Sequence, residues 1–192
     1  MRPTLLLASN SPRRRELLLE AGFDFEIFAP SVTERFDVDL TLRELTAFNA
    51  LRKAMTTARL RPKQVVLAAD TLVIIDDDVL GKPKNKDEAV TMLQRLSGRG
   101  HEVCTSVFIC HLAETKSISF HEVSRVRFRR LSRDGIDNYL TRVNPLDKAG
   151  AYAAQGFGSE IIEKIDGSFT NVVGLPMEKT IVALAEFGLA PK

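Results

Sequence analysis

One long apolar stretch of the chain carries a single acid at its centre. Residues 65–75 read VVLAADTLVII, and their aliphatic and β-branched side chains predict a buried strand that contains Asp70. A buried carboxylate without a partner is costly, so we expect Asp70 to be paired with a cation, bound to a metal or placed at a site. A structural salt bridge or a helix cap is an equally open explanation for one such acid. The cations available in short, turn-flanked segments are Arg13, Arg14, Lys53, Lys82 and Lys148.

The size and charge of the chain exclude several classes of protein. Its 192 residues can bury one core, in a single domain or two closely packed lobes, and no repeat or low-complexity segment interrupts them. A net charge of +2 argues against nucleic-acid binding by bulk electrostatics. The apolar run at residues 5–8 is too short for a signal peptide or a membrane span, so we expect a cytoplasmic protein without membrane contact. Cys104 and Cys110 lie about 20 Å apart along one expected strand and are expected to be reduced.

Apolar periodicity and turn residues divide the chain into alternating helices and strands. Some expected strands are separated by helices and others form hairpins, which predicts an α/β fold with a mixed β-sheet flanked by helices. The expected strands cover residues 4–8, 25–29, 65–75, 103–111, 118–128 and 161–165. The expected helices cover residues 13–21, 42–60, 86–96, 134–143 and 175–187.

The segment Ser9–Arg14, with the sequence SNSPRR, follows an expected strand and opens an expected helix. Free backbone N–H groups and the helix dipole favour an anion there, and phosphate is the obvious candidate. Arginines in the first turn oppose the dipole unless something negative compensates, as a polyphosphate would. The alternative is that the arginines decorate an exposed turn and pair with Glu16 or Glu20.

Other polar segments are less informative. Lys82 follows an expected hairpin whose acidic tip, residues 76–78, we interpret as a solvated turn because its carboxylates diverge. Lys148 and Gln155 lie in a glycine-rich connection that allows close approach to a ligand. The alternating Arg125, Arg127 and Arg129 are expected to be solvated or paired, and the three histidines show no metal-ligand spacing.

With these motifs in place, the sequence resembles the Maf family of nucleoside triphosphate pyrophosphatases almost from end to end. The family's motifs occur in its order and spacing: LASNSPRR at 7–14, ADT at 69–71, GKP at 81–83, LSG at 96–98, DKAGAY at 147–152, QG at 155–156 and VVGLP at 172–176. The resemblance implies an elongated, two-lobed, ITPase-like α/β domain spanning residues 1–192 around a central cleft, commonly a homodimer.

The resemblance also implies an activity, which is hydrolysis of a triphosphate between its α and β phosphorus atoms with a divalent cation, Mg²⁺ or Mn²⁺. Asp70 matches the family's proton acceptor, and Glu34 and Asp70 are the expected metal ligands. The expected phosphate-binding residues are Ser9, Arg13, Arg14, Lys53, Lys82 and Lys148. Arg13, Thr71 and Gln155 match substrate-specificity positions of the subgroup that prefers dTTP and UTP, with a role in nucleotide house-cleaning.

Three departures and two alternatives accompany this interpretation. Arg52 stands where the family commonly has an acid, which reverses a charge near the expected site, and Thr33 and Asn144 also stand where the family often has an acid. A non-catalytic regulator of cell division and septum formation would bind triphosphates with the cations alone. RNA binding through the arginine strand ranks last, and it predicts strongly salt-dependent affinity.

Overall fold

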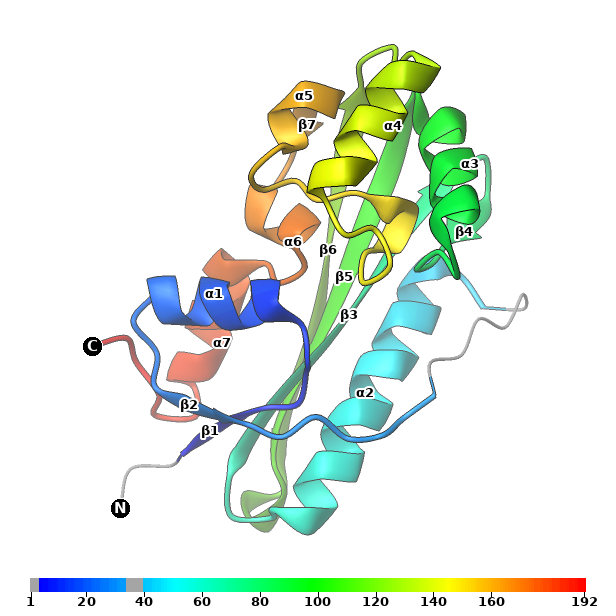
Figure 1. Ribbon diagram of the computed structural model, residues 1–192. Helices are drawn as coiled ribbons and strands as arrows, with labels where there is room; N and C mark the ends of the chain where they lie inside the picture. The colour runs from blue at the N-terminus through cyan, green and yellow to red at the C-terminus, as the bar shows by residue number, and fades with distance from the viewer. Residues whose placement is uncertain (1–3, 34–39) are drawn as a thin grey trace. The chain divides into compact units, whose positions relative to one another are not determined.

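The fold is described from a computed structural model over residues 4–33 and 40–192, which divide into two units (Figure 1). Unit 1 comprises the described residues up to Asp70 together with Thr105–Glu122 and Gly174–Lys192. Unit 2 comprises Thr71–Cys104 and Val123–Val173. The division falls directly after Asp70, so Asp70 belongs to unit 1 and Thr71 to unit 2.

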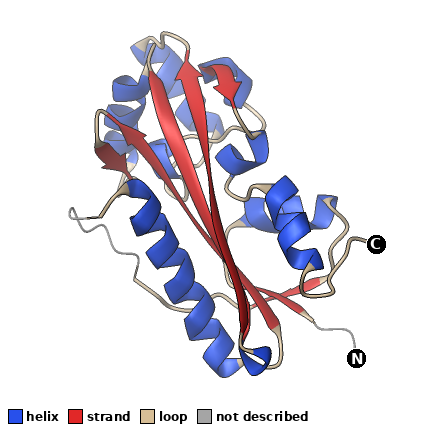
Figure 2. Ribbon diagram, turned by 180° about the vertical axis from the view of Figure 1, so that it is seen from behind, coloured by secondary structure: helices blue, strands red, loops and turns tan. Residues whose placement is uncertain are grey.

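The strands pair in a mixed sheet, as the sequence predicts. Their order is β2-β1-β3-β5-β6-β7, with β4 also paired to β3, and Figure 2 shows the long strands β3, β5 and β6 side by side. β1 is parallel to β2 and β3, whereas β4 is antiparallel to β3 and β7 is antiparallel to β6. The strands are β1 (Leu5–Leu7), β2 (Phe25–Ile27), β3 (Val65–Ile75), β4 (Asp78–Leu80), β5 (Gly100–His111), β6 (Lys116–Phe128) and β7 (Ile162–Asp166).

Capping residues set the start of the longest helices. Thr41 and Glu44 form a capping box at the start of α2, and Asn85 accepts the N–H of Glu88 at the start of α3. The helices are α1 (Pro12–Glu20), α2 (Leu42–Leu60), α3 (Lys86–Leu96), α4 (Arg133–Arg142), α5 (Gly158–Ile161), α6 (Phe169–Val173) and α7 (Met177–Ala185), with short 3₁₀ turns η1 (Leu112–Glu114) and η2 (Ala149–Ala151).

In unit 1, α2 covers one face of the strands, and α1 and α7 cover the other (Figures 1 and 2). Small side chains such as Ala54, Ala58 and Ala68 let α2 approach β1 and β3 closely. Cys110 lies in the same cluster, and burial raises the pKa of its thiol to about 11. Both cysteines are free and buried, as expected.

Unit 2 has its own core, where α3 and α4 pack together. Within it the rings of His101, Phe128 and Tyr152 meet edge to face, and His101 Nε2 lies 2.8 Å from the Tyr152 hydroxyl. Burial lowers the pKa of His101 to about 4, so the imidazole is neutral at pH 7.

The structure refines two sequence expectations. The acidic turn is exposed, as expected, but its side chains are also paired, because Asp76 pairs with Arg99 and Asp78 lies 2.6 Å from Arg95. The closing helix expected over residues 175–187 is α7, and the short helix α6 before it was not expected. Gly174, with φ +124°, lies between the two helices in a conformation that glycine adopts readily.

None of the described helices combines the length and apolar character needed to cross a bilayer.

Candidate active site

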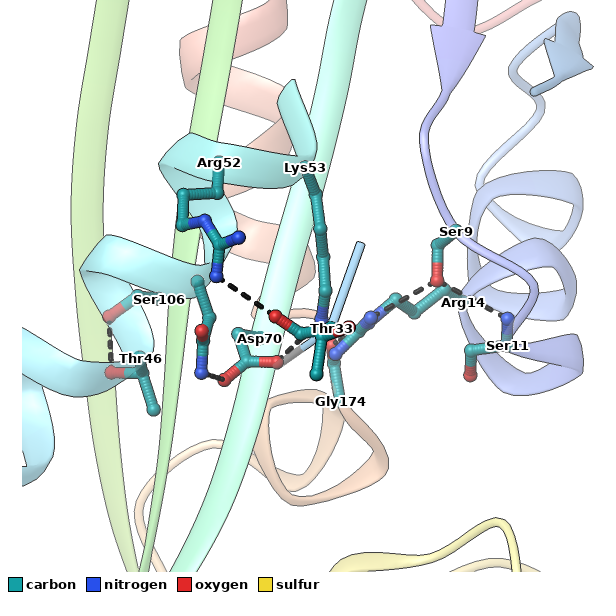
Figure 3. A network of polar contacts seen from close by, with 11 residues as sticks. Ser9, Ser11, Arg14, Thr33, Thr46, Arg52, Lys53, Asp70, Ser106 and Gly174 are labelled. Atoms are coloured by element: carbon teal, nitrogen blue, oxygen red, sulfur yellow. Dashed lines mark hydrogen bonds and ion pairs between the residues drawn. The ribbon is translucent and has the colours of Figure 1, made fainter. Parts of the chain in front are cut away.

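Asp70 is almost fully buried, and its carboxylate accepts hydrogen bonds from two side chains of α2 (Figure 3). Lys53 Nζ donates to Asp70 Oδ1 at 2.6 Å, and Asn49 Nδ2 donates to Asp70 Oδ2 at 3.1 Å. The side chains of Lys53 and Asp70 are 12% and 4% exposed. The buried acid is therefore paired with a cation, which was one of the three explanations the sequence left open.

The donors come from one face of α2 because their spacing follows the helical period. Thr46, Asn49 and Lys53 stand at i, i+3 and i+7, and all three meet polar partners on the strands. Thr46 Oγ1 lies 2.7 Å from Ser106 Oγ of β5, and both residues are buried (Figure 3). Sequence reasoning missed Asn49. The available signal was a buried-face asparagine one turn before a lysine, opposite a strand that carries one acid.

Arg14 is the second buried charge of unit 1 and lies in the first turn of α1. Its Nε donates to the carbonyl oxygen of Gly174 at 2.8 Å, and its Nη1 donates to Ser9 Oγ at 3.1 Å (Figure 3). Ser9 Oγ also accepts the N–H of Ser11 at 3.2 Å. The alternative of arginines that decorate an exposed turn is therefore wrong for Arg14, although Arg15 is exposed and Arg13 is half-buried.

The start of α1 is a fixed positive region. Ser11 occupies the N-cap position and Pro12 follows it, but the Ser11 side chain makes no capping hydrogen bond. The first turn contains no acidic residue. An anion at this helix end would interact favourably with the helix dipole and with the arginine charges.

The register of β1 and β3 places both this region and Asp70 past the carboxyl end of β1. Leu7, the last residue of the parallel strand β1, is paired with Leu67 of β3. Ser9 lies two residues beyond Leu7, and Asp70 lies three residues beyond Leu67, in the part of β3 that continues past β1. Ligands of α/β proteins commonly bind near the carboxyl ends of parallel strands.

Arg52 connects α2 to the chain segment that precedes the helix. Its Nη1 donates to the carbonyl oxygen of Thr33 at 2.9 Å, and its guanidinium lies 5.6 Å from the centroid of the Phe48 ring. The arginine thus holds the chain immediately before Glu34. Glu34 itself, an expected metal ligand, lies outside the described residues.

The other predicted site residues lie in unit 2. Lys148 Nζ lies 2.6 Å from Asp147 Oδ1 and donates to the Asn144 carbonyl at 2.8 Å. The N–H of Gly150 donates to the carbonyl of Gly81, so the segments that carry Lys148 and Lys82 adjoin within this unit. Thr71 and Gln155 are half-buried. The roles predicted for these residues stay predictions.

The chemistry of Asp70 fits a divalent cation that is shared with substrate phosphates. Over residues 4–33 and 40–192 there is no group of three or more His, Cys, Asp or Glu side chains that could hold a metal ion. Mg²⁺ in nucleotide enzymes is commonly held by one or two carboxylates together with substrate phosphates. The carboxylate of Asp70 has that chemistry.

Comparison with known proteins places the chain in a family. Residues 4–187 match the model of the Maf-like protein family. A dTTP/UTP pyrophosphatase of Bacillus pumilus (strain SAFR-032) is 46% identical over 187 residues, covering 97% of this chain and 98% of the relative. Proteins of the same name from Desulforamulus reducens and Symbiobacterium thermophilum are 41% and 45% identical, over 98% and 96% of this chain and 98% and 94% of the relatives. The chain belongs to the Maf family.

Proposed function

We propose that this chain is a nucleoside triphosphate pyrophosphatase that hydrolyses dTTP and UTP to the monophosphate and pyrophosphate. The observation that carries the proposal is the buried Asp70, which accepts hydrogen bonds from Lys53 and Asn49 and lies past the carboxyl end of the parallel strand β1. The substrates dTTP and UTP are inferred from the names of relatives that the chain matches over nearly their whole length.

Asp70 is the proposed proton acceptor. Each carboxylate oxygen has two lone pairs, and Lys53 and Asn49 each use one of them. The remaining lone pairs can accept a proton from a water molecule as its oxygen attacks the α phosphorus. The bond to the bridging oxygen then breaks, and pyrophosphate leaves with the electron pair.

The cations of unit 1 are proposed to hold the triphosphate. Arg14 is fixed by Gly174 and Ser9, so its charge is already oriented before the substrate binds. Arg13 and the N-terminus of α1 add to the same positive region, and Lys53 is placed to neutralise charge near Asp70. Phosphoryl transfer depends mainly on positioning and on electrostatic stabilisation of this kind.

A divalent cation is part of this proposal. Asp70, together with Glu34, would hold it, and the ion when bound would neutralise phosphate charge and activate water. Lys82 and Lys148 are the further phosphate ligands in the proposal, and Thr71 and Gln155 join Arg13 in substrate choice. We place the enzyme in the cytoplasm, with nucleotides rather than nucleic acids or membranes as its partners.

The proposal is tested by product analysis. The chain is incubated with dTTP, UTP, dCTP and dGTP in turn, with Mg²⁺ or Mn²⁺ and with either metal removed by a chelator, in ¹⁸O-labelled water. We expect dTMP and UMP that carry the label, unlabelled pyrophosphate, and no reaction after chelation. Release of inorganic phosphate and dTDP would contradict cleavage at the α–β bond. Tight dTTP binding without any product would instead support the non-catalytic regulator.

A further inference from the structure

One turn of unit 2 presents an aromatic ring to the solvent. Phe169 is the first residue of α6, and its side chain is 47% exposed, whereas Asn171 and Val173 of the same helix are buried. A single exposed apolar side chain needs no explanation by itself. The turn that carries Phe169 is nevertheless built in a way that fixes the position of this residue.

Hydrogen bonds hold the backbone on both sides of Phe169. Before it, Ser124 Oγ donates to the Ser168 carbonyl oxygen at 3.0 Å. After it, the N–H of Asn171 donates to Ser168 Oγ at 3.2 Å. The fully buried side chain of Asn171 donates from Nδ2 to the Val103 carbonyl oxygen at 3.1 Å and to Ser124 Oγ at 2.9 Å. These bonds tie the turn to the strands β5 and β6.

The residue that opens the turn is a glycine for a structural reason. Gly167 has φ +115°, and a Cβ atom there would lie 2.9 Å from Ser124 Oγ. A larger residue would therefore strain the backbone and displace the turn. The turn is already formed before a ligand binds, so a ligand that packs on Phe169 does not have to order it.

Phe169 is close along the chain to the residue that anchors Arg14. Gly174 follows α6 directly, and its carbonyl oxygen accepts the hydrogen bond from Arg14 Nε (Figure 3). The five residues of α6 span about 7.5 Å at 1.5 Å per residue. Only the sugar separates the base of a nucleotide from its phosphates, so the base must lie near the groups that bind the triphosphate.

We propose that the Phe169 ring stacks on the nucleobase of the triphosphate substrate. This contact depends on the proposed function, since it is a contact with that substrate. An aromatic side chain can stack on any base because every base has a π face. Phe169 therefore supplies affinity, whereas the choice among bases stays with the predicted specificity residues Arg13, Thr71 and Gln155.

A fluorescent reporter tests this contact directly. The chain contains no tryptophan, so Phe169→Trp introduces a single indole. We expect the α,β-methylene analogue of dTTP, added with Mg²⁺, to quench the indole fluorescence because the base stacks on the ring. Half-maximal quenching should occur at the analogue concentration that half-saturates the same variant in equilibrium dialysis. The matched control is Phe157→Trp, at an aromatic residue of unit 2 that is 41% exposed, and its fluorescence should not change.

Steady-state kinetics provide a second readout. Loss of one base–aromatic stack weakens binding by about 5- to 150-fold, so we expect Phe169→Leu to raise KM for dTTP and for UTP by a factor in that range. The value of kcat should stay near the original because the stack contributes equally to the bound substrate and the transition state. Phe169→Tyr, which keeps the ring, should restore KM, and Phe157→Leu should not change it.

Three results would overturn the stacking contact. They are binding of the analogue in dialysis without quenching of the Phe169→Trp variant, equal quenching of Phe157→Trp, and an unchanged KM in Phe169→Leu. An unaltered chain that fails to bind the analogue in dialysis would contradict the proposed function itself, and the stacking contact with it.

Discussion

Lys53 and Asp70 form an ion pair with 2.6 Å between Nζ and Oδ1, and both side chains are buried in unit 1. Removing one partner of a buried pair leaves an uncompensated charge, which costs about 3–5 kcal/mol. We therefore expect Lys53→Met to lower the free energy of unfolding by an amount of that order in urea titrations.

The double variant Lys53→Met/Asp70→Leu should recover much of this stability because it removes both charges. Lys63→Met, at an exposed lysine, is the control and should leave stability unchanged. A Lys53→Met variant as stable as the unaltered chain would show that the pair contributes nothing.

Asn49 donates to the other oxygen of Asp70 and so helps to fix the orientation of this carboxylate. In Asn49→Leu we expect kcat for pyrophosphate release to fall by about 10- to 100-fold, because the carboxylate is less well positioned toward the substrate. Thr46→Val, one turn earlier on α2, removes the contact with Ser106 but not a donor to Asp70. Its kcat should be unchanged, and equal losses in both variants would point to a general loss of structure.

Arg14 uses the fork of its guanidinium to reach Ser9 and Gly174 at once. A lysine keeps the charge but lacks this planar geometry. We expect Arg14→Lys to lower the melting temperature and to raise KM for dTTP at least tenfold. Arg15→Lys, at the exposed neighbour, should leave both values unchanged, and an Arg14→Lys variant with the original KM would remove Arg14 from the binding site.

His101 makes unit 2 sensitive to acid. Burial lowers its folded pKa to about 4, below the ordinary value of 6.5, so protonation favours the unfolded chain. Its contribution to stability is present above pH 6.5 and is lost progressively as the pH falls toward 4. At about 1.4 kcal/mol per pKa unit, the total loss is about 3 kcal/mol.

The measurement is the free energy of unfolding against pH for the unaltered chain and for His101→Gln, which cannot titrate. We expect the two curves to converge on acidification because only the unaltered chain loses this contribution. His121→Gln, at an exposed histidine, should follow the unaltered chain at every pH. Parallel curves for His101→Gln and the unaltered chain would assign the acid sensitivity to other groups.

Local signals in the sequence predicted much of the fold. The bounds of α2, β3 and α3 agree with the expected ranges because caps such as Thr41 and Asn85 and an unbroken apolar run mark their ends. The short helix α6 was missed because five residues are too few to display a helical period.

The sequence predicted which charged residues form the candidate site, but it did not predict which groups they contact. The sequence singled out Asp70, Lys53 and Arg14, yet nothing local could show that Arg14 binds a carbonyl 160 positions away. For the same reason Asn49 was overlooked, since its role depends on α2 lying across β3. Long-range pairings of this kind come from tertiary packing.

The central claim is that Asp70 is the proton acceptor of a triphosphate pyrophosphatase, and its most direct test is pyrophosphate release from dTTP by Asp70→Asn. Asparagine keeps the size of the side chain but cannot accept the proton, and a general base contributes about 10²–10⁴-fold. We expect kcat to fall by that factor, whereas Asp77→Asn, in the exposed turn between β3 and β4, keeps the original rate. Pyrophosphate release by Asp70→Asn at the original kcat would contradict the account.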